Sequence, residues 1–383
     1  MNIGIDIRAA RWYRGTGIGT YTYQLINALN NLNYDNAFTL FSDNTSLDID
    51  FKSNFNFKSL PSTQSDNFWD NVKIPAELTP YMVNLYHSPQ NGIGLPFNHN
   101  LPFVITLHDT IPIHMPETVG ENYLNLFNTN MKSIVERCDG IITVSEFSRK
   151  DIAQDFNFPK EKIYVTHLAS EPIYKPINKH ICNTLLKKHY SIPDNYILYV
   201  GGFSPRKNIS GLIEAFSKIQ KKLPKDMTLI IAGTKGKSYS IYKALTDKLH
   251  LTEKVIFPGF IEMEHMPYLY GGAELLVYPS FYEGFGLPPL ESMACGTPVI
   301  ASNVTSIPEI LGDSAILCSP QDIDDLAENI LSVIFDEKQR ATLIKKGFIK
   351  SNSLNWETTA KKTMDAYKQI IHSCNPWFSD EIK

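Results

Sequence analysis

The sequence predicts an α/β fold with two doubly wound parallel-sheet domains. Short apolar runs alternate with helix-type segments along the chain, an order that is typical of parallel strands joined by crossover helices. A length of 383 residues is sufficient for two domains with separate cores. Pro172 and Pro176 bracket a segment that interrupts the alternation, and this segment predicts a domain boundary after residue 172.

The first half of the chain repeats the order of strand and helix. Strands are predicted at 2–7, 38–42, 83–87, 103–107, 140–145 and 162–167. Helices are predicted at 20–32, 122–137 and 146–156, the last with Ser145 as its N-cap. Two segments are expected to form loops, a basic, glycine-rich one at 8–19 and a polar, poorly patterned one at 45–64.

The second half repeats the same order without an internal sequence repeat. Strands are predicted at 196–200, 228–233, 255–258, 274–278, 298–302 and 315–318. The helix at 209–222 follows Asn208, which is a suitable N-cap. The last element is a long amphipathic helix at 356–372.

Composition excludes several classes of protein. Hydrophobic residues make up 43% and charged residues 20%, as in ordinary soluble proteins. The net charge of −4 argues against nucleic acid as a partner. The five cysteines are scattered without a C-x-x-C motif, which indicates a reducing compartment and no zinc site. With no signal peptide and no apolar run of about 18 residues, we expect a cytoplasmic protein, with contact to the inner face of the membrane left open.

The stretch at 279–298 has the pattern of an anion site. Two glycines, Gly284 and Gly286, allow a ligand to approach the backbone between a strand and a helix. Pro288 and Pro289 suit the first turn of that helix, whose N-terminus attracts negative charge. The loop carries Glu283, and Glu291 is expected in the first helical turn. Carboxylates that bind hydroxyls beside a phosphate site predict a nucleotide sugar as ligand.

A second candidate phosphate site follows the strand at 196–200. Gly201 and Gly202 end that strand, and Arg206 and Lys207 stand directly before the Asn208 cap. Exposed turns often carry two solvated cations. Here the glycines, the cap and the strand end converge, and guanidinium and ammonium groups both bind phosphate. This convergence predicts that Arg206 and Lys207 bind phosphate, and the resemblance described below implies that they neutralise a departing diphosphate.

The first half of the chain carries weaker signals. Gly15, Gly17 and Gly19 do not form a G-x-G-x-x-G motif, and on spacing alone they fit a mobile loop as well as a phosphate-binding turn. Arg8 and its neighbouring arginines in this loop are either solvated or face an anionic acceptor. His108 follows a strand end, where ligands of open α/β sheets bind, although a lone histidine is often bound by a carbonyl group instead.

These motifs together resemble the retaining GT-B glycosyltransferases of family 4. The resemblance is carried by the E-x7-E stretch EGFGLPPLESMACGTPVIAS, by GTGIGTYTYQL, LHDTIP, TVSEFSRKDI and SPRKN, and by IPEI and GD after the E-x7-E stretch. It implies two Rossmann-like domains that face each other across a cleft. The implied acceptor domain is 1–172 with a returning C-terminal helix at about 357–383, and the implied donor domain is 173–356.

The resemblance also implies roles for individual residues. Glu283 and His108 become catalytic candidates. The implied substrate-binding residues are Gly17, Gly19, Gly202, Arg206, Lys207, Phe260, Ile261, Gly284, Phe285, Gly286, Leu287 and Glu291. No metal or other cofactor is expected, because the D-x-D pair Asp48 and Asp50 does not follow an apolar strand.

The implied reaction transfers a hexosyl unit from a nucleotide sugar to a glycan or lipid-linked acceptor with retention. The pattern is most similar to bacterial mannosyltransferases of surface polysaccharide synthesis and favours GDP-mannose. The alternatives are UDP-glucose, UDP-galactose, UDP-GlcNAc and dTDP-rhamnose. Two other classes stay open, a nicotinamide oxidoreductase, which would need the missing G-x-G-x-x-G motif, and a non-catalytic scaffold that binds nucleotide sugars.

Overall fold

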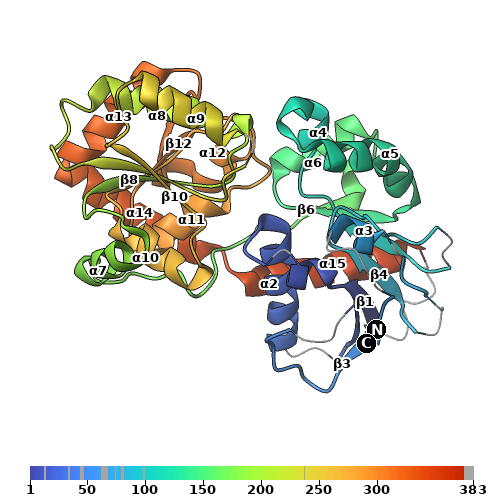
Figure 1. The fold of residues 1–383 in the computed structure, drawn as a ribbon. Coiled ribbons are helices and arrows are strands. Elements are labelled where there is room, and N and C mark those ends of the chain that lie inside the picture. Colours follow the sequence, from blue (N-terminus) through green and yellow to red (C-terminus); the bar gives the residue numbers. More distant parts are fainter. Residues whose placement is uncertain are drawn as a thin grey trace. The chain divides into compact units, whose positions relative to one another are not determined.

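The computed structural model describes residues 1–12, 14–32, 35–43, 47–61, 68–73, 75–78, 82–97, 100–236 and 238–374 (Figure 1). Its internal contacts divide the chain into two compact units. The first unit contains Met1–Leu168 together with the chain from Trp356 onward, and the second contains Ala169–Asn355. Residues 375–383 of the predicted C-terminal helix lie outside the described residues.

The first unit is built on a seven-stranded parallel sheet with the order β3-β2-β1-β4-β5-β6-β7. Most of its strands are buried on both faces, which explains why they are continuous apolar runs in the sequence. The strands are β1 (Asn2–Asp6), β2 (Ala37–Ser42), β3 (Phe55–Ser59), β4 (Leu85–Ser88), β5 (Phe103–Thr106), β6 (Gly140–Thr143) and β7 (Ile163–Val165).

Helices connect these strands, and the last helix of the chain packs onto the same unit. The α-helices are α1 (Arg8–Trp12), α2 (Gly17–Asn31), α3 (Phe68–Val72), α4 (Ile111–His114), α5 (Glu121–Arg137), α6 (Glu146–Asp155) and α15 (Trp356–Cys374), and a short 3-10 turn, η2 (Lys160–Lys162), precedes β7. The Thr359 hydroxyl of α15 donates to the His167 carbonyl over 2.6 Å. A Cβ atom at Gly140 would collide with Ile370, so this glycine allows α15 to approach β6.

The second unit is built on a six-stranded parallel sheet with the order β10-β9-β8-β11-β12-β13. The strands are β8 (Tyr196–Val200), β9 (Thr228–Ala232), β10 (Val255–Gly259), β11 (Leu275–Tyr278), β12 (Val299–Ser302) and β13 (Ile316–Cys318). The helices are α7 (Lys179–Tyr190), α8 (Ile209–Ile219), α9 (Tyr239–Lys248), α10 (Met266–Gly272), α11 (Leu287–Ala294), α12 (Ile307–Leu311), α13 (Ile323–Phe335) and α14 (Glu337–Ser353), with the 3-10 turn η3 (Pro205–Lys207).

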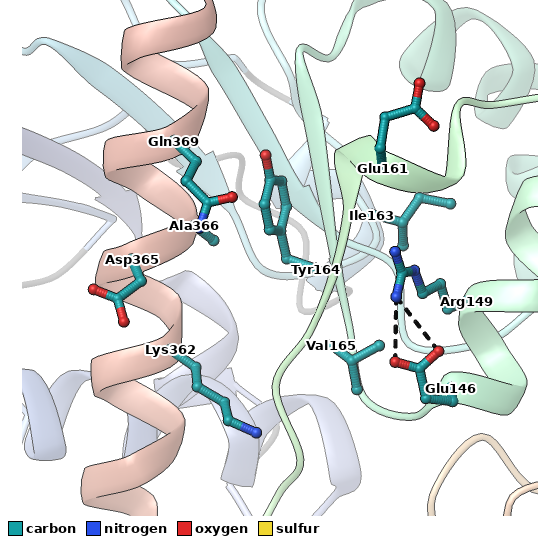
Figure 2. A pocket seen from close by; sticks show the side chains of 10 residues that line it. All are labelled: Glu146, Arg149, Glu161, Ile163, Tyr164, Val165, Lys362, Asp365, Ala366 and Gln369. Atoms are coloured by element: carbon teal, nitrogen blue, oxygen red, sulfur yellow. Dashed lines mark hydrogen bonds and ion pairs between the residues drawn. The ribbon is translucent and has the colours of Figure 1, made fainter.

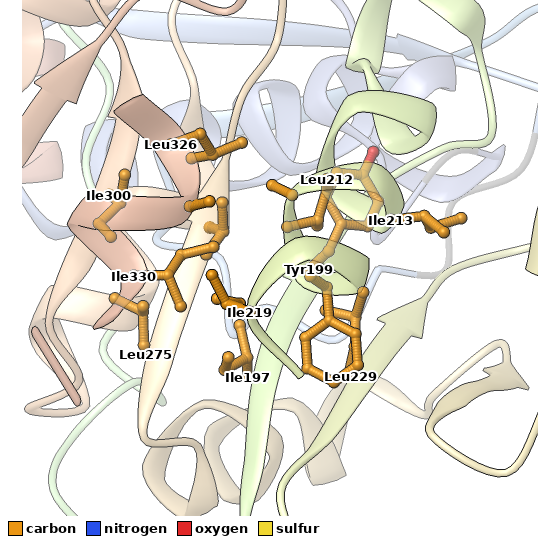
Figure 3. Packing of buried hydrophobic residues seen from close by; sticks show 14 of the residues in the cluster. Ile197, Tyr199, Leu212, Ile213, Ile219, Leu229, Leu275, Ile300, Leu326 and Ile330 are labelled. Carbon is orange, nitrogen blue, oxygen red and sulfur yellow. The ribbon is translucent and has the colours of Figure 1, made fainter. Parts of the chain in front are cut away.

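The core of the second unit is formed by alternate residues of the strands and by one face of each covering helix (Figure 3). Alternate residues of β8, such as Ile197 and Tyr199, point to one face of the sheet. The facing stripe of α8 repeats every three or four residues, and Leu212 and Phe216 are fully buried in it. Ile330 of α13 packs into the same cluster. The prediction of two Rossmann-like parallel-sheet domains is therefore confirmed.

Two predicted loops contain regular structure. The segment 45–64 includes the edge strand β3, in which Phe55 stacks on Phe38 of β2 with ring centroids 4.6 Å apart. Several β3 side chains are exposed, so the segment is polar and lacks an apolar run. The segment 8–19 contains α1 and the first residues of α2. The predictions of loops at these two places were wrong.

Strand order places the candidate sites. It reverses between β1 and β4 in the first sheet and between β8 and β11 in the second. In open α/β sheets, ligands bind beyond the carboxyl ends of the strands at such a switch point. The turns after β8 and β11 are the glycine-rich segments that the sequence predicts to bind phosphate.

Candidate active site

The turns after β8 and β11 contact each other in the second unit. After β8, the chain passes Gly201 and forms η3, which contains Arg206 and Lys207. After β11, the backbone N–H of Phe281 donates to the carbonyl of Arg206 over 2.7 Å. Arg206 Nη1 in turn donates to the Tyr282 carbonyl over 2.9 Å. The two predicted phosphate-binding turns therefore form one surface.

Glu283 is the centre of this surface. Its Oε1 atom lies 2.5 Å from Nζ of Lys207, and its Oε2 atom lies 3.0 Å from Nη1 of Arg206. The Lys207 ammonium also donates to the Tyr278 hydroxyl over 2.9 Å. Glu283 is 6% exposed and Lys207 is 8% exposed, so these charges meet where water is largely excluded.

The two cations keep Glu283 ionised. Burial alone would raise the pKa of its carboxyl group, but attraction to Lys207 and Arg206, with the Lys207 hydrogen bond, lowers that pKa to about 2. At neutral pH the group is therefore a hydrogen-bond acceptor and a poor general base. Two cations and one carboxylate leave one net positive charge, which favours an anionic ligand.

The loop after Glu283 is held by its neighbours. The Ser306 hydroxyl donates to the Glu283 carbonyl over 2.8 Å, and the Glu283 N–H donates to the Thr305 hydroxyl over 3.1 Å. Gly286 has a φ of 99° and precedes α11, and a Cβ atom there would lie only 2.8 Å from Cδ1 of Ile307. Glycine is thus required. Helix α11 begins at Leu287, and Pro288 and Pro289 lie in its first turn, as predicted.

Glu291 lies in a different environment from Glu283. It is in the second turn of α11, so the prediction of the first turn was wrong. The Tyr270 hydroxyl donates to its Oε2 atom over 2.6 Å, and Tyr270 packs edge-on against Tyr174. Burial, reinforced by repulsion from Glu171, raises the pKa of Glu291 to about 7.

The remaining predicted residues of the second unit lie at neighbouring strand ends. The Gly202 carbonyl accepts a hydrogen bond of 3.0 Å from the Tyr199 hydroxyl. After β10, Phe260 is 57% exposed whereas Ile261 is 4% exposed. The Phe260 ring is therefore accessible to a ligand, and Ile261 can offer only its backbone.

In the first unit, Gly17 is the first residue of α2. The Thr16 side chain caps this helix by accepting from the Gly19 N–H over 3.4 Å. A Cβ atom at Gly17 would meet nothing within 4 Å, so its backbone is open to a ligand.

Arg8 is not open to solvent or to a ligand. Its guanidinium is buried in an ion pair with Asp6 at 2.5 Å. The expectation that Arg8 is solvated or faces an acceptor was wrong.

His108 is neutral at physiological pH. Its Nε2 atom donates to the Pro89 carbonyl over 3.1 Å, and its ring meets the Tyr21 ring edge-on at 5.0 Å. Burial lowers the pKa of its imidazole to about 4, although the Pro89 hydrogen bond opposes this shift. Since a carbonyl accepts from Nε2, the Nδ1 atom carries the lone pair and can accept from a ligand hydroxyl.

Comparison with known proteins decides the family. The sequence profile of "Glycosyltransferase Family 4" matches residues 15–169, and that of "Glycosyl transferases group 1" matches residues 185–349. The "O-antigen chain mannosyltransferase B" of Escherichia coli is 35% identical over 294 residues, which cover 76% of each chain. This chain belongs to glycosyltransferase family 4. It is a hexosyltransferase.

Solved glycosyltransferases have the same GT-B fold. The sucrose-phosphate synthase of Thermosynechococcus elongatus matches with a TM-score of 0.75 and 22% identity, over 97% of this chain and all of that one (100%). Anabaena Alr3699/HepE in complex with UDP-glucose matches with a TM-score of 0.72 and 18% identity, over 96% of this chain and 100% of that one. The prediction of a GT-B glycosyltransferase is confirmed.

Several side chains of this glycosyltransferase were missed in the sequence. Tyr278 binds Lys207, and Thr305 and Ser306 fix the loop at Glu283. Tyr270 binds Glu291. Their only local signals are that Tyr278 ends a strand and that Thr305 and Ser306 precede a helix. Their partners are distant in sequence.

No metal site or membrane span is found in the described part of this glycosyltransferase. Its residues contain no group of three or more His, Cys, Asp or Glu side chains that could hold an ion. The backbone carbonyls of Asp48 and Asp50 accept hydrogen bonds from Tyr23 and Asn30. Within the same ranges, no helix combines the length and apolar character that a membrane span requires.

Proposed function

We propose that this enzyme transfers a mannosyl unit from GDP-mannose to a hydroxyl of a glycan or lipid-linked glycan, with retention of configuration. The cluster of buried Glu283 and Lys207 with half-buried Arg206 is the observation that carries the proposal. It combines cations for a diphosphate with an ionised acceptor for sugar hydroxyls on one surface. The similarity to an O-antigen chain mannosyltransferase supports mannose as the transferred sugar.

The diphosphate binds to the cationic side of the cluster. Lys207 and Arg206 together exceed the charge of Glu283, and the backbone N–H groups at 284–287 precede or begin α11, whose N-terminus is positive. As the bond from the anomeric carbon to the phosphate oxygen breaks, negative charge grows on the diphosphate. Fixed cations and dipoles stabilise that charge without reorganisation.

Glu283 binds the sugar rather than removing a proton. With its pKa near 2, the carboxylate accepts hydrogen bonds from sugar hydroxyls and leaves the acceptor proton to a stronger base. In the proposed same-face step, the acceptor oxygen bonds to the anomeric carbon as the phosphate departs. The acceptor proton moves to an oxygen of the leaving phosphate. Glu291 and Phe260 contact the nucleoside part, and His108 accepts from a hydroxyl of the transferring sugar.

A donor screen tests the proposal. Purified enzyme is incubated with mannosyl-terminated glycans and, separately, with GDP-mannose, UDP-glucose, UDP-galactose, UDP-GlcNAc and dTDP-rhamnose, and products are detected by mass spectrometry. We expect a mass increase of one hexose only with GDP-mannose, together with tighter binding of GDP than of UDP. Faster transfer from a UDP-hexose or dTDP-rhamnose than from GDP-mannose would refute GDP-mannose as the donor. Binding of a nucleotide sugar without transfer or hydrolysis would favour a non-catalytic scaffold.

A further inference from the structure

A groove lies along the side of β7 in the first unit (Figure 2). Its volume of about 430 Å³ is within the range of small-molecule sites, roughly 300–1,000 Å³. Helix α15 forms one wall, and α6 with the turn before β7 forms the other. Neither the Glu283 cluster nor His108 lines this groove, so the function proposed above does not use it.

The wall on α15 is a single stripe of the helix. Lys362, Asp365, Ala366 and Gln369 have the spacing of residues that share one helix face. Ala366 is small and 1% exposed, so the middle of the stripe leaves space while longer polar side chains stand on either side. Within the described residues, the side chains of Lys362, Asp365 and Gln369 make no hydrogen bond or ion pair. Their polar groups are therefore open to a ligand.

The opposite wall is already ordered. Nη1 of Arg149 lies 3.3 Å from Oε1 of Glu146, and Nη2 of Arg149 donates to the Lys160 carbonyl over 2.9 Å. Tyr164 of β7 lies between the walls and is half-buried. An aromatic ring with a hydroxyl offers both an apolar surface and a polar group to one ligand.

The charges of the lining select against anions. Arg149 and Lys362 are positive, and Glu146, Glu161 and Asp365 are negative, so the lining has a net charge of −1 (2 − 3). Both walls carry donor and acceptor groups, and the Tyr164 ring lies between the walls. Sugar hydroxyls both donate and accept, and the C–H groups of a sugar ring pack against an aromatic face.

We infer that this groove binds neutral sugar units of the glycan acceptor, as a second saccharide site outside the transfer site. The inference rests on the proposed glycan acceptor. Such a site would retain a growing chain between transfers, so longer acceptors would bind more tightly than short ones.

Direct binding tests the groove without the reaction. The full chain, free of nucleotide, is titrated with α-linked mannotetraose and followed by calorimetry and saturation-transfer NMR. We expect Asp365→Ala and Gln369→Ala each to raise the Kd at least about fivefold, the effect of losing one hydrogen bond. Lys368→Ala is the matched control, because Lys368 is exposed on α15 and does not line the groove. It should leave the Kd unchanged.

Three results would overturn the inference. These are no saturable binding by the wild-type chain, an unchanged Kd in both groove variants, and tighter binding of a sulfated tetrasaccharide than of the neutral one. Transfer and GDP binding are measured separately on the same samples. If GDP-mannose were not a donor but the groove variants still weakened mannotetraose binding, the proposed function would be refuted and the groove would remain a saccharide site.

Discussion

The carboxylate of Glu283 accepts a 2.5 Å hydrogen bond from the ammonium group of Lys207, and both side chains are buried. This pair joins the turns after β8 and β11, at the position where the strand order reverses. The carboxylate and the cations are thus fixed before a ligand arrives. Replacing Lys207 should mainly weaken binding of the diphosphate. Replacing Glu283 should mainly impair binding of the transferring sugar.

Lys207→Met should weaken GDP binding at least about tenfold, because it removes a charged donor at the phosphate site. It should also lower the free energy of unfolding by about 2 kcal/mol, since Glu283 loses a charged hydrogen bond. Calorimetry and urea unfolding measure the two effects. Lys218→Met is the control, because its ion pair with Asp324 is exposed and should change stability by less than about 1 kcal/mol. Unchanged GDP affinity in Lys207→Met would contradict the role of Lys207.

Glu283→Gln should lower kcat/KM for transfer by about 100-fold or more, because the amide preserves the shape but loses the ionised acceptor. GDP affinity should stay the same or increase, since Arg206 and Lys207 lose their carboxylate partner. Steady-state transfer and GDP titration are measured on the same preparation. Wild-type transfer rates would exclude Glu283 from the reaction.

The sequence predicts those parts of the site that depend on local chemistry. Asn208 caps α8, and Pro288 and Pro289 lie in the first turn of α11, as expected from the intrinsic preferences of these residues. The pairing of Lys207 with Glu283 was not predicted, because the two residues are 76 positions apart. It depends on β8 lying beside β11, and the alternation of strands and helices does not specify that order.

The same reason explains the other differences. The basic character of Arg8 suggested solvent or an acceptor, but its guanidinium pairs with Asp6, two positions away, and donates to the Asn71 carbonyl, 63 positions away. The strand β3 was missed because an edge strand with exposed side chains has no apolar run. The contact of Arg8 with Asn71 and the pairing of β3 with β2 join distant parts of the chain, so local preferences do not reveal them.

Stability should fall between pH 4.5 and pH 7 because of Glu291. Its pKa is raised from 4.5 to about 7, so the folded protein holds a proton that the unfolded chain has released. The cost of ionising the buried group is absent below pH 4.5 and complete above pH 7, where it reaches about 3 kcal/mol. Urea unfolding across this range should show a shallower decline for Glu291→Gln. An identical slope in the variant would contradict the assignment.

The transfer reaction should survive EDTA. Arg206 and Lys207 supply the positive charge at the diphosphate, so the proposed step needs no divalent ion. Product formation is compared with and without chelator, and then after manganese is added back. Complete loss that manganese restores would point to Asp48 and Asp50 instead.

Replacing His108 should affect transfer, whereas replacing His87 should affect stability. His108→Ala should lower kcat/KM about 10- to 100-fold, because one hydrogen bond to the transferring sugar is lost. His87 is buried and fixed on both sides, with Nδ1 at 2.7 Å from the Tyr367 hydroxyl and Nε2 at 2.8 Å from the Thr106 hydroxyl. His87→Ala leaves both hydroxyls without this partner and should cost about 2–5 kcal/mol of stability.

The pH profile separates these roles further. Burial holds the pKa of His108 near 4 and that of His87 near 3, so neither imidazole gains a proton between pH 5 and pH 8. The kcat/KM of the wild-type enzyme should therefore show no histidine-type inflection near pH 6.5. An inflection at that pH that disappears in His108→Ala would show that His108 acts as an acid or base, and would replace the proposed role of a neutral hydrogen-bond acceptor.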